Sequence, residues 1–246
     1  KIIAVASLEN HIYALIERTD GVYLERADVQ SGYVTDAMDS GVYLDRVIPL
    51  NGIYLSGADE TLVTLPYPVT DIANFQLVRG SGFVGEVQTL IDPSTYTFSS
   101  ATEILIPTDE TAGEIYAGVP YEMRYTFSQQ FMRAQEKAIT TGRYMLRTFV
   151  AYFTDTAFFS TEVAPYGTDP LIETVVPSQL ADFTGKTIGA DSLIVGEPVY
   201  HTGSYAFQVY GNSKEAVVTL VNDTHLQSKF QSVELEGFYT NRAKAL

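Results

Sequence analysis

Apolar and polar residues follow a period of two along most of this chain. Residues 122–127 alternate between polar and apolar, and the runs at 11–17, 22–26, 205–210 and 216–221 are rich in β-branched and aromatic residues. A period of two places successive side chains on opposite faces of a strand, whereas an amphipathic helix repeats every 3.6 residues. Short strands separated by turn residues are typical of sandwiches, barrels and propeller blades. The pattern therefore predicts an all-β fold.

Turn residues separate these runs. Asp20-Gly21, preceded by Thr19, lies between two strand-like runs and predicts a hairpin over 11–26, because glycine supplies the positive φ that such a turn needs. Gly211-Asn212-Ser213 predicts a second turn, between 205–210 and 216–221.

One segment has a composition that favours a helix. Residues 129–141 carry Phe131, Ala134 and Ala138 at helical spacing, and Gly142 would end a helix there. Local propensity favours a short helix over an irregular excursion between strands, but propensity is a weak determinant that tertiary contacts override.

Composition excludes several classes of protein. Hydrophobic residues make up 46% of the 246 residues and aromatic residues 12%, which is typical of a chain with a packed core. No apolar run approaches the roughly 18 residues of a transmembrane helix. Cysteine is absent, which excludes disulfides and zinc–cysteine sites. The net charge of −15 has the wrong sign for a protein that binds nucleic acid by neutralising phosphates.

The distribution of charged residues and of turn residues along the chain predicts three domains. Residues 1–112 hold 16 acidic and 5 basic side chains, whereas residues 113–246 hold 14 and 10. We expect residues 1–46 to be the end of an upstream β-propeller, 47–112 a β-rich insert and 113–246 a C-terminal β-sandwich-like domain. Because the chain begins inside a strand-like run, we expect a fragment of a longer protein, with the first hairpin belonging to an incomplete propeller blade. An upstream segment or a neighbouring copy would then complete its sheet.

The sequence predicts neither a cofactor nor a metal. Residues 80–85, Gly-Ser-Gly-Phe-Val-Gly, match the glycine pattern of dinucleotide-binding loops, but the short segment that follows stops at Pro93 instead of forming the required helix. A glycine-rich turn is the favoured interpretation. His11, His201 and His225 are not spaced as metal ligands, although ligands from distant segments could still meet.

Carboxylates leave an enzymatic alternative open. Asp155, Glu162, Asp169 and Glu173 are the densest acidic group near aromatic residues, and carbohydrate-active sites combine paired carboxylates with aromatic platforms. Thirty acidic residues among 246 also produce such groups by chance, and nothing in the sequence fixes the separation between two carboxylates. We therefore predict that the chain is not an enzyme and has no catalytic residues. The glycosylation-type triplet that begins at Asn222 is interpreted as a turn.

Basic residues are concentrated in one stretch. Arg124, Arg133, Arg143 and Arg147, together with Lys137, lie within 24 residues. This is the only local basic patch in the sequence. We expect these side chains to form ion pairs with acidic segments, and we take the four arginines as a candidate subunit interface.

Two long segments, 118–163 and 202–242, resemble a known family. The matching motifs, in order, are Gly118-Val119-Pro120-Tyr121, Tyr125-Thr126-Phe127-Ser128, Thr141-Gly142-Arg143 with Leu146-Arg147, Tyr152 with Asp155-Thr156, and residues 222–239. Their order and spacing resemble the C-terminal part of the tail tubular protein B family, the tail nozzle proteins of short-tailed podoviruses. The hairpin over 11–26, with its Tyr23-Leu24-Glu25-Arg26, resembles the last propeller strands of that family more weakly, and residues 47–112 carry no motif of it.

The resemblance implies a role. Family members form a six-fold ring at the distal end of the short tail, and the viral genome leaves the particle through the resulting tube. They contact the tail adaptor ring and the tail fibres, and no enzyme motif belongs to the family. For this chain the resemblance implies that the domain at 113–246 is ring-forming. It also implies a homohexamer in the virion that meets the host cell surface, lets DNA pass without binding it specifically and is joined to an upstream part of the same protein.

The charge distribution suggests which residues would face the DNA. Lysine and arginine hold phosphates tightly, whereas negative charge around a lumen repels them. Since residues 1–112 hold most of the net charge, the candidate lumen-facing residues are Asp36, Asp39, Asp45, Asp59 and Glu60.

Two alternative functions of the chain stay open. One is a carbohydrate-binding or carbohydrate-hydrolysing tail module that acts on the host surface, and the other is a fragment of an extracellular adhesin.

Overall fold

The computed structural model describes residues 1–8, 11–27, 41–134, 137–139, 142–166, 179–186 and 197–241. These residues form antiparallel strands and one 3-10 helix, so the predicted all-β fold is confirmed. Within them no helix has the length and apolar character needed to cross a membrane. The chain divides into a first unit, Lys1–Pro120 with Ile194–Glu197, and a second unit, Tyr121–Leu193 with Pro198–Leu246. The three-part division at 46 and 112 stays a prediction.

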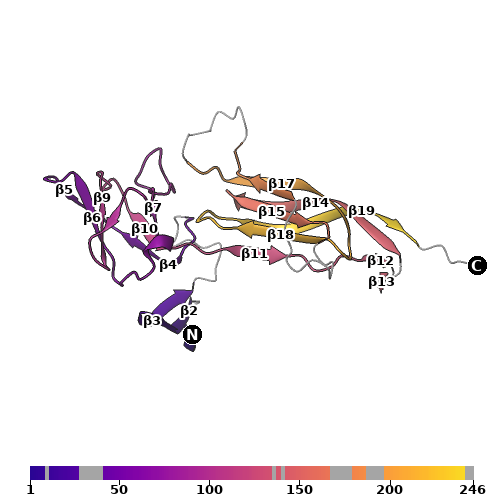
Figure 1. The fold of residues 1–246 in the computed structure, drawn as a ribbon, viewed down its shortest axis with the longest axis horizontal. Helices are drawn as coiled ribbons and strands as arrows, with labels where there is room; N and C mark the ends of the chain where they lie inside the picture. Colours follow the sequence, from indigo (N-terminus) through magenta and orange to yellow (C-terminus); the bar gives the residue numbers. More distant parts are fainter. Residues whose placement is uncertain are drawn as a thin grey trace, which may run out of the picture. The chain divides into compact units, whose positions relative to one another are not determined.

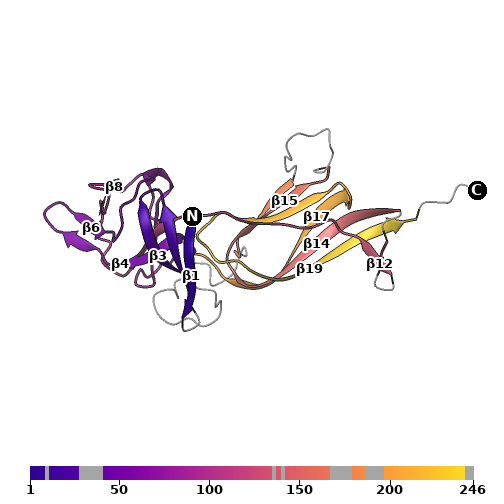
Figure 2. The ribbon, with the colours of Figure 1, turned by 90° about the horizontal axis from the view of Figure 1, so that it is seen from below.

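The first unit begins with a three-stranded antiparallel sheet. Its strands, in spatial order, are β1 (Ile2–Leu8), β2 (His11–Arg18) and β3 (Gly21–Ala27) (Figure 2). The turn Thr19-Asp20 joins β2 to β3 and pairs Arg18 with Gly21, so the hairpin predicted over 11–26 is present. Within the part of the chain that the structure describes, this sheet pairs with no further strand.

Two further sheets complete the described part of the first unit. In one, β10 (Ile115–Val119) lies between β4 (Asp45–Leu50) and β7 (Gln76–Arg79). The other contains, in order, β5 (Ile53–Leu55), β6 (Glu60–Thr64), β9 (Glu103–Ile106) and β8 (Thr97–Phe98). The 3-10 helix η1 (Ile72–Asn74) precedes β7.

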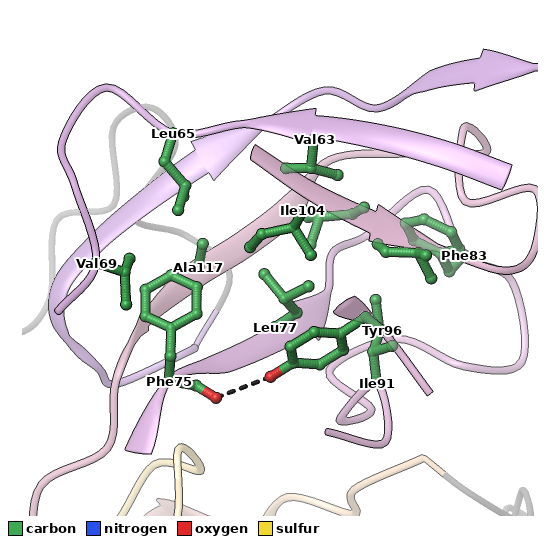
Figure 3. Close-up of a cluster of buried hydrophobic side chains, with 12 residues drawn as sticks. Val63, Leu65, Val69, Phe75, Leu77, Phe83, Ile91, Tyr96, Ile104 and Ala117 are labelled. Carbon is green, nitrogen blue, oxygen red and sulfur yellow. Dashed lines mark hydrogen bonds between the residues drawn. The ribbon is translucent and has the colours of Figure 1, made fainter. Parts of the chain in front are cut away.

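The core of the first unit lies between these two sheets. Val63 on β6 and Ile104 on β9 belong to the same buried cluster as Leu77 on β7 and Ala117 on β10 (Figure 3). Members of this cluster that lie on the same strand are two residues apart, such as Ile104 and Ile106 on β9, as the period-two pattern requires. The buried Tyr96 hydroxyl donates a hydrogen bond of 2.8 Å to the backbone carbonyl oxygen of Phe75, so its polar end is satisfied inside the core.

The second unit contains two larger sheets that share one core (Figure 1). The first consists of β11 (Met123–Thr126), β18 (Val217–Asn222), β15 (Phe159–Ala164) and β16 (Gln179–Phe183). The second consists of β17 (His201–Asn212), β14 (Arg143–Thr156) and β19 (Lys229–Thr240). This is the arrangement of a β-sandwich.

Strand β14 is the centre of this sandwich and shows how the sequence pattern produces it. Phe149, Ala151 and Phe153 are each at most 1% exposed, whereas Val150 and Tyr152 between them are partly exposed. The Phe153 ring lies 4.7 Å from the ring of Phe183 on the other sheet, as measured between centroids. Alternate apolar positions therefore create one buried face, which packs against the opposite sheet.

The helix predicted over 129–141 is wrong. The described residues of this segment form a hairpin of β12 (Met132–Ala134) and β13 (Lys137–Ile139), in which Met132 pairs with Ile139. The predicted helical face carried Phe131 and two alanines, which offers little apolar area for a helix to bury. Gly142 instead makes a turn into β14 at φ +98°, and a Cβ there would lie 2.7 Å from the Tyr239 hydroxyl oxygen.

The turn after β17 also has a different role from that of a hairpin. β17 pairs with β14, whereas β18 pairs with β11 and β15. The turn at 213–215 thus carries the chain from one sheet of the sandwich to the other. The sequence locates this turn but does not encode which partners the flanking strands choose.

Candidate functional site

A charged cluster joins the first sheet to the rest of the first unit. The Arg46 guanidinium lies 4.3 Å from the ring centroid of Tyr23 and 3.8 Å from that of Tyr67. Its Nη1 is 3.3 Å from an Asp20 carboxylate oxygen, and its buried Nη2 has no hydrogen-bond partner among the described residues. Arg46 adopts φ 55°, which is uncommon outside glycine. Cation–π contacts and an ion pair therefore fix the side chain of a strand-edge residue between two sheets.

Arg18 is the second cation of this cluster. It binds Glu25 through two nitrogens, at 2.6 and 2.7 Å, and its Nη1 lies 2.9 Å from Asp45 Oδ2. The hydrogen bond to Glu25 is the main reason that the pKa of Arg18 is raised. Burial raises the pKa of Tyr67 to about 12, and its hydroxyl donates to the Arg46 carbonyl oxygen at 2.8 Å. The negative charge of Asp45 is thus compensated inside the cluster.

The other candidate lumen-facing residues have different surroundings. Asp59 is exposed and accepts a hydrogen bond of 2.6 Å from the Tyr54 hydroxyl. Glu60 follows it as the first residue of β6, and neither carboxylate has an ion-pair partner in the described part of the chain. Asp36 and Asp39 lie outside the described residues. The lumen-facing assignment of all five residues stays a prediction.

Two of the four candidate interface arginines are engaged within the chain. Arg124 on β11 contacts Glu122 and Glu162, and the hydrogen bond to Glu162 is the main cause of its raised pKa. Arg147 lies where the pairing of β14 with both neighbours shifts register, and its Nη1 is 3.6 Å from Glu236 Oε1. Both cations therefore already have carboxylate partners in the second unit: Glu236 on the adjacent strand β19 for Arg147, and Glu162 on β15, across the intervening strand β18, for Arg124.

The other two candidate interface arginines are free of such pairs. Arg133 on β12 and Arg143 at the start of β14 are exposed, and neither forms an ion pair with a residue that the structure describes. The sequence analysis treated all four arginines as one candidate interface. In the structure they differ, because only Arg124 and Arg147 form an ion pair with a described acidic side chain.

The glycine motif at 80–85 is a turn. No helix occurs anywhere in the fully described stretch 80–119. A Cβ on Gly80 would lie 2.6 Å from the Glu114 carbonyl oxygen, and one on Gly82 would lie 2.5 Å from that of Ala112. These glycines allow two backbone segments to approach closely, which is the structural role favoured by the sequence.

The structure describes two carboxylates of the predicted acidic group, and each lies beside a cation. No group of three or more metal-binding side chains gathers among the described residues. An Asp155 carboxylate oxygen lies 3.5 Å from the Lys229 ammonium, while Glu162 is paired with Arg124. Asp169 and Glu173 lie outside the described residues. The two described carboxylates of the predicted acidic group are thus each paired with a cation.

Asn222 belongs to a turn, as predicted. Its side-chain oxygen accepts hydrogen bonds from the Thr224 backbone N–H and hydroxyl at 2.9 and 2.8 Å, and its amide nitrogen donates to the Leu226 carbonyl oxygen at 2.7 Å. Only 5% of Asn222 is exposed. Its hydrogen bonds and burial make it a structural residue that closes the loop after β18.

The first sheet exposes apolar side chains that the sequence analysis did not single out. Leu8, Val22 and Leu24 are 63%, 55% and 72% exposed. The pairing of β1 with β2 and of β2 with β3 places all three on the same face of the sheet. The nearly continuous apolar composition of residues 2–8 was an available signal, because a strand with one solvated face normally alternates.

The family model of the bacteriophage nozzle protein matches residues 1–246, the whole chain. No curated protein matches this sequence.

Proposed function

This chain belongs to the bacteriophage nozzle protein family, and from that membership we propose that it forms part of the distal nozzle of a short phage tail. As a member of the family it is a structural component of the phage tail and is assembled within the virion. The family match over the whole chain is the observation that carries the proposal. The nozzle would be a homohexameric ring through which viral DNA passes into the host cell.

The charge of the chain supports a role as a conduit. The net charge is −15, and residues 1–112 contain 16 acidic and 5 basic side chains. A lumen rich in lysine and arginine would bind the phosphates of the passing DNA, independently of sequence. An acidic ring instead repels them, so the DNA would slide through without being held.

Asp59 and Glu60 are the strongest described candidates for such a lumen. They are adjacent, and no cation among the described residues forms an ion pair with either. Asp45 would contribute less, because Arg18 compensates it at 2.9 Å. Asp36 and Asp39 complete the proposed set.

The contacts of this nozzle follow from its position in the tail. It would be joined to an upstream part of the same protein, which would complete the exposed first sheet, and it would contact the tail adaptor ring, the tail fibres and the host cell surface. We assign no enzymatic activity to it, because the described carboxylates Asp155 and Glu162 are each paired with a cation.

Two experiments test the proposal. Gold-labelled antibodies against this chain should mark the distal tip of the tail in electron micrographs of intact virions. Label on the capsid or along the fibres would overturn the proposed position.

The second experiment tests the acidic lumen. Particles should be prepared with the full-length protein carrying Asp36→Lys, Asp39→Lys, Asp59→Lys and Glu60→Lys. We expect DNA ejection to slow several-fold at low salt and to recover as salt rises, because screening weakens phosphate binding. Asp182→Lys with Asp223→Lys, outside the proposed set, provides a lysine control. Equal ejection rates for all particles at every ionic strength would contradict the lumen assignment.

A further inference from the structure

One end of the second unit carries a hairpin that the rest of the unit does not cover. β12 and β13 pair with each other and with no other described strand, and they project from the sandwich beside the first residues of β14 (Figure 2). A two-stranded hairpin by itself is marginally stable in water. A contact with another surface would therefore stabilise this hairpin.

Large apolar side chains are exposed at this end. Phe131 and Met132 at the base of β12 are 37% and 42% exposed, and Phe238 near the end of β19 is 63% exposed. Phe238 pairs with Met145, two residues after the start of β14, so it belongs to the same end of the sandwich. Aromatic residues and methionine are enriched in protein interfaces.

The same end carries uncompensated positive charge. Arg133 on β12, Lys137 on β13 and Arg143 on β14 are exposed, and none has a carboxylate partner within the residues that the structure describes. By contrast, Arg124, Arg147 and Lys229 of the same unit all have one. Three cations without an ion-pair partner among the described residues, in a chain of net charge −15, favour an acidic partner.

We infer that the hairpin end, defined by Phe131, Met132, Arg133, Lys137, Arg143 and Phe238, is the contact surface for the acidic first unit of a second copy of this chain. Residues 1–112 carry 16 acidic and 5 basic side chains, so a second copy offers the complementary charge. The contact joins different surfaces of the two copies. Such a head-to-tail contact produces a ring when its rotation closes, which is the assembly that the proposed function requires.

Charge reversal tests the inference on the full chain. The concentration dependence of mass is measured by analytical ultracentrifugation at 50 and 500 mM NaCl. We expect the wild-type chain to self-associate and to dissociate more readily at high salt. Arg133→Glu with Arg143→Glu should raise the dissociation constant at least about tenfold, and Arg133→Gln with Arg143→Gln should raise it less.

Lys186→Glu with Lys229→Glu is the matched control, because it makes the same change in net charge within the second unit but away from the hairpin end. Lys229 pairs with Thr154, near the opposite end of β14, and Lys186 follows β16, whose Phe183 pairs with Phe159 just after β14. Its dissociation constant should stay within about twofold of the wild-type value. Thermal unfolding by circular dichroism establishes that each variant is folded. The inference is overturned if the arginine variants associate like the wild-type chain, or if the wild-type chain is monomeric at low salt.

A gel-shift assay with a short DNA duplex examines a different ligand. If the wild-type chain binds the duplex and the arginine variants lose that binding but keep self-association, the hairpin end is a phosphate-binding surface and the inference is wrong.

The inference rests on the proposed function, but the experiments can contradict the inference without contradicting the proposed function. Label at the tail tip combined with unimpaired assembly of the arginine variants would remove only the inference.

Discussion

Arg79 holds both carboxylate oxygens of Glu110, and the Glu110 side chain is only 4% exposed. The Nε–Oε2 distance is 2.8 Å, and the Thr108 hydroxyl adds a hydrogen bond of 3.0 Å to Oε1. The hydrogen bond to Glu110 is also the main reason that the pKa of Arg79 is raised. This buried pair connects β7 to the loop that precedes β10.

The first prediction concerns this pair. Glu110→Gln should destabilise the protein by about 3 kcal/mol, because the Arg79 charge loses its buried partner. Glu86→Gln is the control: its carboxylate is also within 3.3 Å of Arg79 but is 59% exposed, so its loss should cost less than about 1 kcal/mol. Urea unfolding followed by circular dichroism measures both. Equal losses in the two variants would contradict the assignment of Glu110 as the structural partner.

The second prediction concerns the glycine turn. Gly82→Ala should destabilise the protein by about 1 to 3 kcal/mol, because the new Cβ would lie 2.5 Å from the Ala112 carbonyl oxygen and the Gly113 Cα. Gly57→Ala should change stability by less than about 0.5 kcal/mol, since nothing lies within 4 Å of its Cβ position. Thermal unfolding of the two variants distinguishes them. A neutral Gly82→Ala would show that the two backbone segments are not in close contact.

The sequence predicted the strands well where one face is buried. Residues 205–210 were predicted as a strand-like run, and in β17 the buried Phe207 and Val209 alternate with the exposed Gln208, as a strand with one buried face requires. The hairpin at 11–26 was predicted for a similarly local reason, because its turn residues lie between two strand-like runs.

The sequence could not predict features that depend on distant partners. β17 and β18 look like a hairpin locally, yet they lie in different sheets, because their partners β14 and β15 come from earlier in the chain. Residues 129–141 have helical propensity, yet residues 132–134 and 137–139 form strands. Likewise, Arg124 and Arg133 are equivalent in the sequence, but Glu162 on β15, which lies beyond β18 in the same sheet, engages only Arg124.

The third prediction is a loss of stability in alkali. Burial raises the pKa of Tyr96 to about 12, whereas an unfolded tyrosine titrates near 10. Folding therefore favours the protonated hydroxyl. This contribution is complete below about pH 10 and disappears as the pH rises toward 12, so stability should fall across that window. Tyr67, whose pKa is also raised to about 12, acts in the same direction.

Urea unfolding at intervals from pH 8 to pH 12 measures this effect. Tyr96→Phe should be about 1 kcal/mol less stable at neutral pH, because it loses the hydrogen bond to the Phe75 carbonyl oxygen. It should nevertheless show a shallower fall in stability between pH 10 and 12, since one of the hydroxyls whose pKa folding raises is gone. Tyr125→Phe, at a tyrosine that is 58% exposed, should keep the wild-type slope. If Tyr96→Phe loses stability as steeply as the wild-type protein, the alkaline transition does not depend on the buried Tyr96 hydroxyl.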